Sequence, residues 1–223
     1  MRRRYRVRWV VTLVAVIIAV VVPLVQTRIN GWVSQPTKAQ QQMVHAASSQ
    51  LDRLTVKGRA PKTGYARSQF GDGWALVGQC DTRNLILARD LIDVHVSSAC
   101  KVMKGTLNDP YTAKTILFER GATTSDLVQI DHIVALSNAW QTGAQQLSPL
   151  VREKFANDPL NLLAVDGGAN QEKSDSDAAS WLPPHKPFRC QYIARQIQVK
   201  TKYSLWVTSD EKAAMTQVLA RCR

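Results

Sequence analysis

The chain has 223 residues, of which 45% are hydrophobic and 21% are charged, and its formal net charge is +12. This length suits one domain with an accessory segment, and the apolar content excludes a wholly disordered chain. No repeat with a period of about 20 to 50 residues occurs, which excludes solenoids and propellers. The composition also excludes collagen-like, coiled-coil and multi-span membrane proteins.

The positive charge is concentrated at the N-terminus. The first thirty residues contain six arginines and no acidic residue, and the rest of the chain has 23 basic and 17 acidic residues, a net charge of +6. A moderately basic body suits a polyanionic partner such as nucleic acid. An ordinary solvated surface explains the same charge, so charge alone does not decide between the two.

Residues 10–25 form an apolar run of 16 residues that follows five arginines. Positive residues before such a run stay in the cytoplasm, so the remainder of the chain should be translocated. We expect residues 1–30 to be an uncleaved membrane anchor, with a cleaved signal peptide as the alternative. In both cases the body is extracytoplasmic, either membrane-anchored or secreted.

The four cysteines are even in number and widely spaced: Cys80, Cys100, Cys190 and Cys222. The absence of a C-x-x-C pair disfavours a structural zinc site, and an oxidising compartment favours disulfides. Of the three possible pairings we predict the one that is local in the sequence, Cys80–Cys100 and Cys190–Cys222.

The N-terminal part of the body begins with an amphipathic pattern at residues 37–56, where Met43, Ala47, Leu51 and Leu54 share one helical face. We assign this helix to a linker, residues 31–60, that precedes a domain at 61–223. Residues 58–80 are rich in glycine and turn-forming residues.

A short helix should follow Cys80, with Asp81 or Thr82 as its N-cap. The residues expected on its buried face are Leu85, Ala88, Leu91 and Ile92. Segments 100–107 and 112–119 flank a turn signal and predict a hairpin. Helices near 188–199 and 210–221 should close the chain, and Thr208 and Glu211 should form a capping box.

The central segment predicts a strand, a connection, a second strand and a helix. An alternating run at 127–136 indicates the first strand, and residues 161–165 indicate the second. We expect a turn at 166–168 and a helix at 170–180, which would place Asn170, Lys173 and Asp177 on one face. The adjacent Asp131 and His132 are unexpected in an apolar strand, because buried charge is unfavourable without a partner.

These motifs resemble a known family. The strings DHIVAL, NLLAV and ANQEKSD are similar to the HNH, or ββα-metal, nuclease motif, including the nuclease module of RNA-guided CRISPR effectors. The longer strings FANDPLNLLAV and WLPP, followed by R-C-x-Y, resemble exported bacterial HNH proteins related to the C-terminal domain of GmrSD-type restriction enzymes. The resemblance spans about residues 64–222, with its core at 128–184.

The resemblance implies roles for four residues, and the position of Lys173, one helical turn after Asn170, suggests a fifth. His132 would be the general base that activates water, and Asn161 would complete the catalytic set by fixing the loop between the strands. Asp131 and Asn170 match metal-ligand positions for one divalent ion, Mg²⁺ in the first place and Mn²⁺ as the alternative. Lys173 would contact substrate phosphate, and an ordinary solvated helix lysine is the competing interpretation.

The expected protein is therefore an α+β domain with a ββα-metal (HNH, or His-Me finger) core at about 127–184, surrounding helices, a β-hairpin and disulfides. We predict an exported or membrane-anchored, monomeric endonuclease that hydrolyses DNA, with RNA as the alternative substrate. An imidazole titrating near neutral pH suits the proton transfer, and a hard cation suits oxygen ligands. The alternatives are a nucleic-acid-binding protein without catalysis and a structural envelope protein.

Overall fold

The computed structural model describes residues 37–122 and 124–222, so the predicted leader at 1–30 lies outside the described residues. Residues from Ala39 onward form one compact unit. Within the described ranges, no helix is both long enough and apolar enough to cross a membrane.

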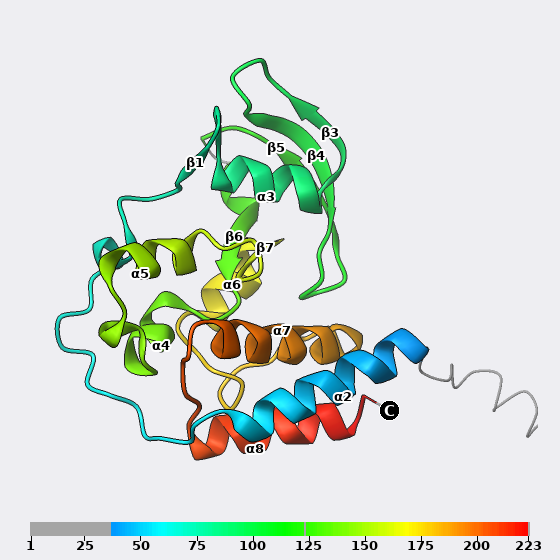
Figure 1. Ribbon diagram of the computed structural model, residues 1–223. Helices are drawn as coiled ribbons and strands as arrows, with labels where there is room; N and C mark the ends of the chain where they lie inside the picture. The colour runs from blue at the N-terminus through cyan, green and yellow to red at the C-terminus, as the bar shows by residue number, and fades with distance from the viewer. Residues whose placement is uncertain (1–36, 123, 223) are drawn as a thin grey trace, which may run out of the picture. The chain divides into compact units, whose positions relative to one another are not determined.

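Helices and small antiparallel sheets alternate along this unit, which confirms the predicted α+β class (Figure 1). The helices are α2 (Lys38–Arg53), α3 (Thr82–Asp90), α4 (Leu136–Gln141), α5 (Pro149–Ala156), α6 (Gly167–Lys173), α7 (Arg189–Lys202) and α8 (Ser209–Ala220). The strands are β1 (Leu76–Val77), β2 (Cys80–Asp81), β3 (Ile92–Val96), β4 (Val102–Asn108), β5 (Thr115–Glu119), β6 (Val128–His132) and β7 (Leu162–Asp166).

Strands β6 and β7 pair antiparallel, and α6 follows β7 directly, so the predicted order of strand, strand and helix is present. The turn predicted at 166–168 is wrong, because the Asp166 side chain caps α6 by accepting from the Ala169 backbone N–H. The predicted end of the helix at residue 180 is also wrong. Ser174 has a positive φ of 50°, which ends the helix after Lys173 and leaves Asp177 outside it.

Gly167 allows the start of α6 to lie directly against the backbone before β6. A Cβ atom at this position would lie 2.1 Å from the Asp126 carbonyl oxygen, so only glycine permits the approach. The glycine thereby fixes the start of α6 beside the segment that leads into β6, the strand that carries Asp131 and His132.

The predicted hairpin is confirmed as β4 and β5, and β3 adds a third strand that we did not predict. Asp81 is the N-cap of α3, as expected, but the predicted buried face is wrong for three residues. Leu85, Ala88 and Ile92 are exposed, whereas Ile86 and Leu87 are buried with Leu91 in a core against β4, β6 and β7. The helix carries apolar residues on both sides, and only tertiary contacts decide which side is buried.

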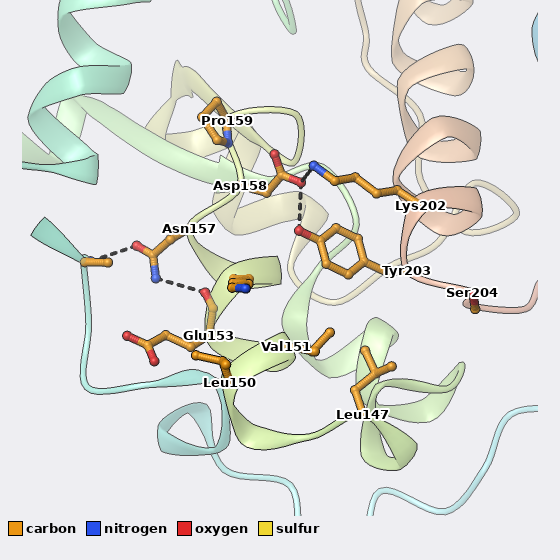
Figure 2. A pocket seen from close by; sticks show the side chains of 12 residues that line it. Leu147, Leu150, Val151, Glu153, Asn157, Asp158, Pro159, Lys202, Tyr203 and Ser204 are labelled. Atoms are coloured by element: carbon orange, nitrogen blue, oxygen red, sulfur yellow. Dashed lines mark hydrogen bonds and ion pairs between the residues drawn. The ribbon is translucent and has the colours of Figure 1, made fainter. Parts of the chain in front are cut away.

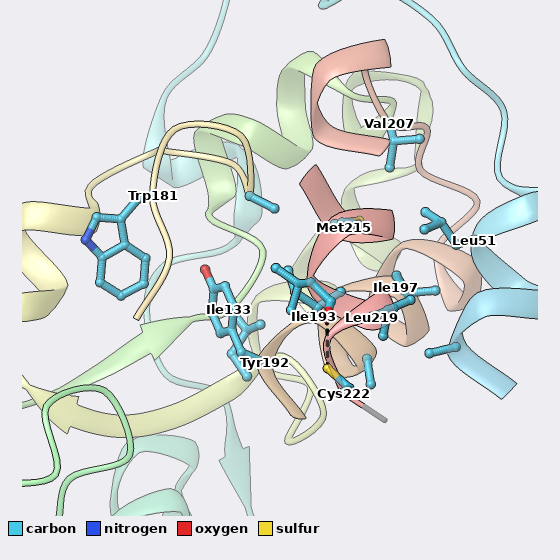
Figure 3. Close-up of a cluster of buried hydrophobic side chains, with 14 of the residues drawn as sticks. Leu51, Ile133, Trp181, Tyr192, Ile193, Ile197, Val207, Met215, Leu219 and Cys222 are labelled. Carbon is cyan, nitrogen blue, oxygen red and sulfur yellow. Dashed lines mark hydrogen bonds between the residues drawn. The ribbon is translucent and has the colours of Figure 1, made fainter. Parts of the chain in front are cut away.

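The C-terminal helices α7 and α8 pack together, and α2 lies beside α8 (Figure 1). Leu51 from α2, Ile193 from α7 and Met215 from α8 meet in one buried cluster (Figure 3). The predicted linker helix therefore contributes to the core of this unit. Thr208 caps α8 as predicted, but Glu211 is buried and pairs with Lys200 instead of closing the capping box.

Both predicted disulfides are confirmed, Cys80–Cys100 and Cys190–Cys222. We expect replacement of Cys190 and Cys222 by serine to lower the free energy of unfolding by about 3 kcal/mol, because the bond restricts the unfolded chain. Urea unfolding of the oxidised protein and of the double variant measures this difference. An unchanged midpoint would show that the bond contributes nothing to stability.

Candidate active site

An open pocket of about 680 Å³ lies where β6, α3, α6 and the segment before α3 meet. Its lining is mainly polar and includes Arg67, Arg83, Gln129, Asp131, His132 and Asn170. All three residues predicted as the base and the metal ligands therefore border the same open space.

Strand alternation directs the side chains of His132 and Asp131 to opposite faces of the β6–β7 sheet. The His132 Nε2 atom is 2.9 Å from the Ala156 carbonyl oxygen, and the ring stacks on Trp74 with an interplanar angle of 5°. A carbonyl can only accept, so Nε2 carries the proton and Nδ1 of the neutral ring carries the lone pair. Nδ1 makes no hydrogen bond within the described part of the chain.

Burial lowers the pKa of His132 from 6.5 to about 4, since the side chain is almost fully enclosed and the charged form loses its hydration. The Ala156 carbonyl and Asp131 act in the opposite direction, and Arg67 and Lys173 lower the pKa further. The ring is therefore neutral at pH 7 and has a lone pair available to accept a proton.

This pKa shift predicts a pH-dependent stability. The unfolded chain binds a proton at His132 near pH 6.5, whereas the folded protein does so only near pH 4. We expect the contribution of neutral His132 to the free energy of unfolding to be complete above pH 6.5. It should fall by about 3 kcal/mol between pH 6.5 and pH 4. Urea unfolding as a function of pH should show a smaller fall in His132→Gln than in wild type.

The control for this measurement is His45→Gln, which alters an exposed histidine and should retain the wild-type pH profile. Equal profiles for wild type and His132→Gln would contradict the lowered pKa of His132.

Asp131 is enclosed and already has two partners. Its Oδ1 accepts from Lys173 Nζ at 2.8 Å, and its Oδ2 accepts from the Tyr111 hydroxyl at 2.5 Å. Lys173 Nζ also donates to the His132 carbonyl oxygen, and neither charged side chain is more than 5% exposed. Lys173 is thus the internal counter-ion of Asp131. In the structure its ammonium group contacts Asp131 and the His132 carbonyl, and these contacts take the place of the predicted phosphate contact.

The two asparagines have different environments. Asn161 is fully buried, and its side chain accepts from the Val134 N–H at 2.9 Å and donates to the Val134 carbonyl. These bonds hold the backbone just after His132 in place. Asn170 borders the pocket, and its Nδ2 donates to Gln129 Oε1 at 2.8 Å, which leaves its Oδ1 facing no described hydrogen-bond donor.

The oxygen donors of this pocket suit a hard divalent cation. Each carboxylate oxygen of Asp131 has two lone pairs and uses one of them, and Asn170 Oδ1 is free. Mg²⁺ commonly binds one or two protein oxygens and completes its shell with phosphate and water. No group of three or more His, Cys, Asp or Glu side chains is suitably placed among the described residues, so an all-protein metal cage is not formed.

Several residues around the site carried no recognisable signal in the sequence. Trp74 and Tyr111 lie in turn segments far from β6 in the chain, yet one stacks on His132 and the other binds Asp131. Arg67 and Arg83 line the pocket and form no ion pair with a carboxylate of the described residues. Gln129 could have been found, because strand alternation places it on the same face as Asp131.

A second pocket, of about 740 Å³, lies between α5 and the end of α7 (Figure 2). Its Asp158 carboxylate accepts from both Lys202 Nζ and the Tyr203 hydroxyl. The pocket is mostly apolar and contains no histidine or arginine. It therefore has no group equivalent to the neutral His132, and the β6–α6 pocket is the stronger candidate for catalysis.

Comparison with known proteins places the chain in a family of nuclease-related domains. The family described as GmrSD restriction endonucleases, C-terminal domain, matches residues 81–218, so the chain belongs to this family. A protein of Arthroderma benhamiae named "Uncharacterized secreted protein" is 39% identical over 189 residues, which are 84% of this chain and 90% of that protein. No solved structure matches the chain.

Proposed function

We propose that the protein is a metal-dependent endonuclease that hydrolyses phosphodiester bonds of DNA, with β6, β7 and α6 as a ββα-metal core. The observation that carries this proposal is the neutral His132, which borders the same open pocket as Asp131 and Asn170 and whose Nδ1 has no hydrogen bond within the described residues. Membership of the GmrSD C-terminal domain family supports a nuclease-related reaction.

In the proposed reaction His132 Nδ1 accepts a proton from water while the water oxygen bonds to phosphorus, one ester P–O bond breaks, and the leaving oxygen takes a proton from bulk water. The Ala156 carbonyl and the face of Trp74 hold the ring in one tautomer and one orientation, so little reorganisation is needed. Asn161 acts as a positioning residue, since it fixes the backbone that follows His132. Arg67, near the ring, adds positive charge on the side of the pocket where a phosphate would lie.

Asp131 and Asn170 would hold the divalent ion, which would neutralise charge on the phosphate when bound. The Lys173 ammonium already balances the charge of Asp131, so we expect weak metal binding in the absence of substrate. We further propose that the protein acts outside the cytoplasm as a monomer. Two observations support this location. The Arthroderma benhamiae relative is named as a secreted protein, and the chain contains two disulfides.

Incubation of the oxidised protein with supercoiled plasmid and Mg²⁺ or Mn²⁺ tests the proposed function. We expect nicked and linear products, and we expect EDTA to abolish them. If the plasmid is retarded in the gel but remains intact, the protein binds nucleic acid without cleaving it, and the proposed enzyme activity is wrong. Neither cleavage nor retardation would favour a structural role, with Asp131 and Lys173 serving only as a buried ion pair.

A further inference from the structure

Arg83 is the second residue of α3 and borders the same pocket as His132 and Asp131. Its guanidinium is half-buried, and its Nη1 is enclosed with no hydrogen-bond partner. Its Nη2 is 3.5 Å from the Val128 carbonyl oxygen, at the limit of a hydrogen bond. The guanidinium at this polar pocket therefore has one enclosed nitrogen without a partner and one nitrogen with only a long hydrogen bond.

No carboxylate of the described residues forms an ion pair that balances the positive charge of Arg83. Asp81 is bound to Asn84 as the cap of α3, and Asp126 in the pocket lies beyond ion-pairing distance. Arg120, a cation that interacts electrostatically with Arg83, donates to Asn84 Oδ1 and the Val102 carbonyl. Burial, and after it the charge of Arg120, lowers the pKa of Arg83, and the charges of Asp81 and Asp126 offset this only in part.

Other enclosed arginines of this protein are satisfied by their surroundings. Arg195 donates to the carbonyls of Pro159, Leu160 and Leu162. Arg152 donates to the carbonyls of Gln69 and Leu147. Arg83 thus differs from these enclosed arginines, and a half-buried cation without a partner is disfavoured unless an anion completes it.

We propose that Arg83 binds a backbone phosphate of the nucleic acid on the side of the pocket formed by α3. The identity of the anion rests on the proposed nuclease function, whereas the need for an anion rests on the missing partners of Arg83. A planar guanidinium suits charge-assisted hydrogen bonds to phosphate oxygens, and the part of the Arg83 guanidinium that borders the pocket would donate them. The contact would orient the strand across the pocket and would carry no base selectivity.

The test compares Arg83→Met with Arg53→Met in the otherwise complete protein. Arg53 is exposed on α2, so both variants lose one positive charge, but only Arg83 borders the pocket. Binding of a fluorescein-labelled DNA duplex is measured by anisotropy in EDTA at several NaCl concentrations, and the duplex is checked to be intact. We expect the slope of log K against log salt to fall by about 0.9 for Arg83→Met and to be unchanged for Arg53→Met.

Thermal unfolding of the same variants separates binding from folding. Arg83→Met removes an uncompensated charge and retains the volume, so its melting temperature should equal or exceed that of wild type. A lower melting temperature together with an unchanged slope would overturn the proposal and assign Arg83 to structure. Absence of duplex binding by wild type would overturn it as well.

The outcomes for Arg83 and for hydrolysis can be told apart. If the salt slope changes for Arg83→Met but wild type does not cleave plasmid, the phosphate contact of Arg83 is supported and hydrolysis is rejected. Plasmid cleavage by wild type with equal slopes for the two methionine variants would support hydrolysis and reject the role of Arg83.

Discussion

Replacement of His132 by glutamine should reduce metal-dependent plasmid cleavage by about a hundredfold or more, the usual contribution of a positioned general base. The glutamine amide can still donate to the Ala156 carbonyl, so the local hydrogen bond can persist, but the side chain cannot accept a proton at neutral pH. Initial rates of plasmid nicking at saturating Mg²⁺ measure the effect.

His95→Gln is the control, because His95 is exposed on β3 and does not border the pocket. It should cleave plasmid at the wild-type rate. Wild-type cleavage by His132→Gln, with an intact far-ultraviolet spectrum, would eliminate His132 as the base. The acid limb of kcat/KM should lie near pH 4 instead of 6.5, because burial lowers the pKa of His132 to about 4.

Replacement of Lys173 by methionine should lower the free energy of unfolding by about 3–5 kcal/mol, the range for removing one partner of a buried ion pair. The enclosed Asp131 carboxylate would then lose its counter-ion and keep only the hydrogen bond from the Tyr111 hydroxyl. Urea unfolding at pH 7 measures the loss. The double variant Asp131→Asn with Lys173→Met should recover much of it, since no charge is left unpaired.

Lys62→Met is the matched control, because Lys62 pairs with Asp175 at nearly the same distance, 2.9 Å, but both side chains are substantially exposed. Exposed pairs contribute about 0–1 kcal/mol, so this variant should unfold close to wild type. Equal losses for the two lysine variants would contradict the buried role assigned to Lys173.

Local patterns in the sequence were sufficient for much of the fold. Apolar periodicity predicted α2, alternation predicted β6, and a capping signal marked the start of α8. Proximity along the chain predicted both disulfides. Helix ends were less predictable. The end of α6 at Lys173 depends on the positive φ of Ser174, for which no glycine or proline gave a signal.

The sequence by itself determined the membership of the nuclease-related family, and its ordered motifs predicted His132, Asp131, Asn161 and Asn170 as the candidate site. Tertiary structure alone decided what each side chain contacts. Tyr111 and Trp74 reach the site from distant turns, and Lys173 faces inward to Asp131 instead of outward to solvent. Hydrogen bonds and burial act through space between residues far apart in the chain, so periodicity and spacing do not encode them.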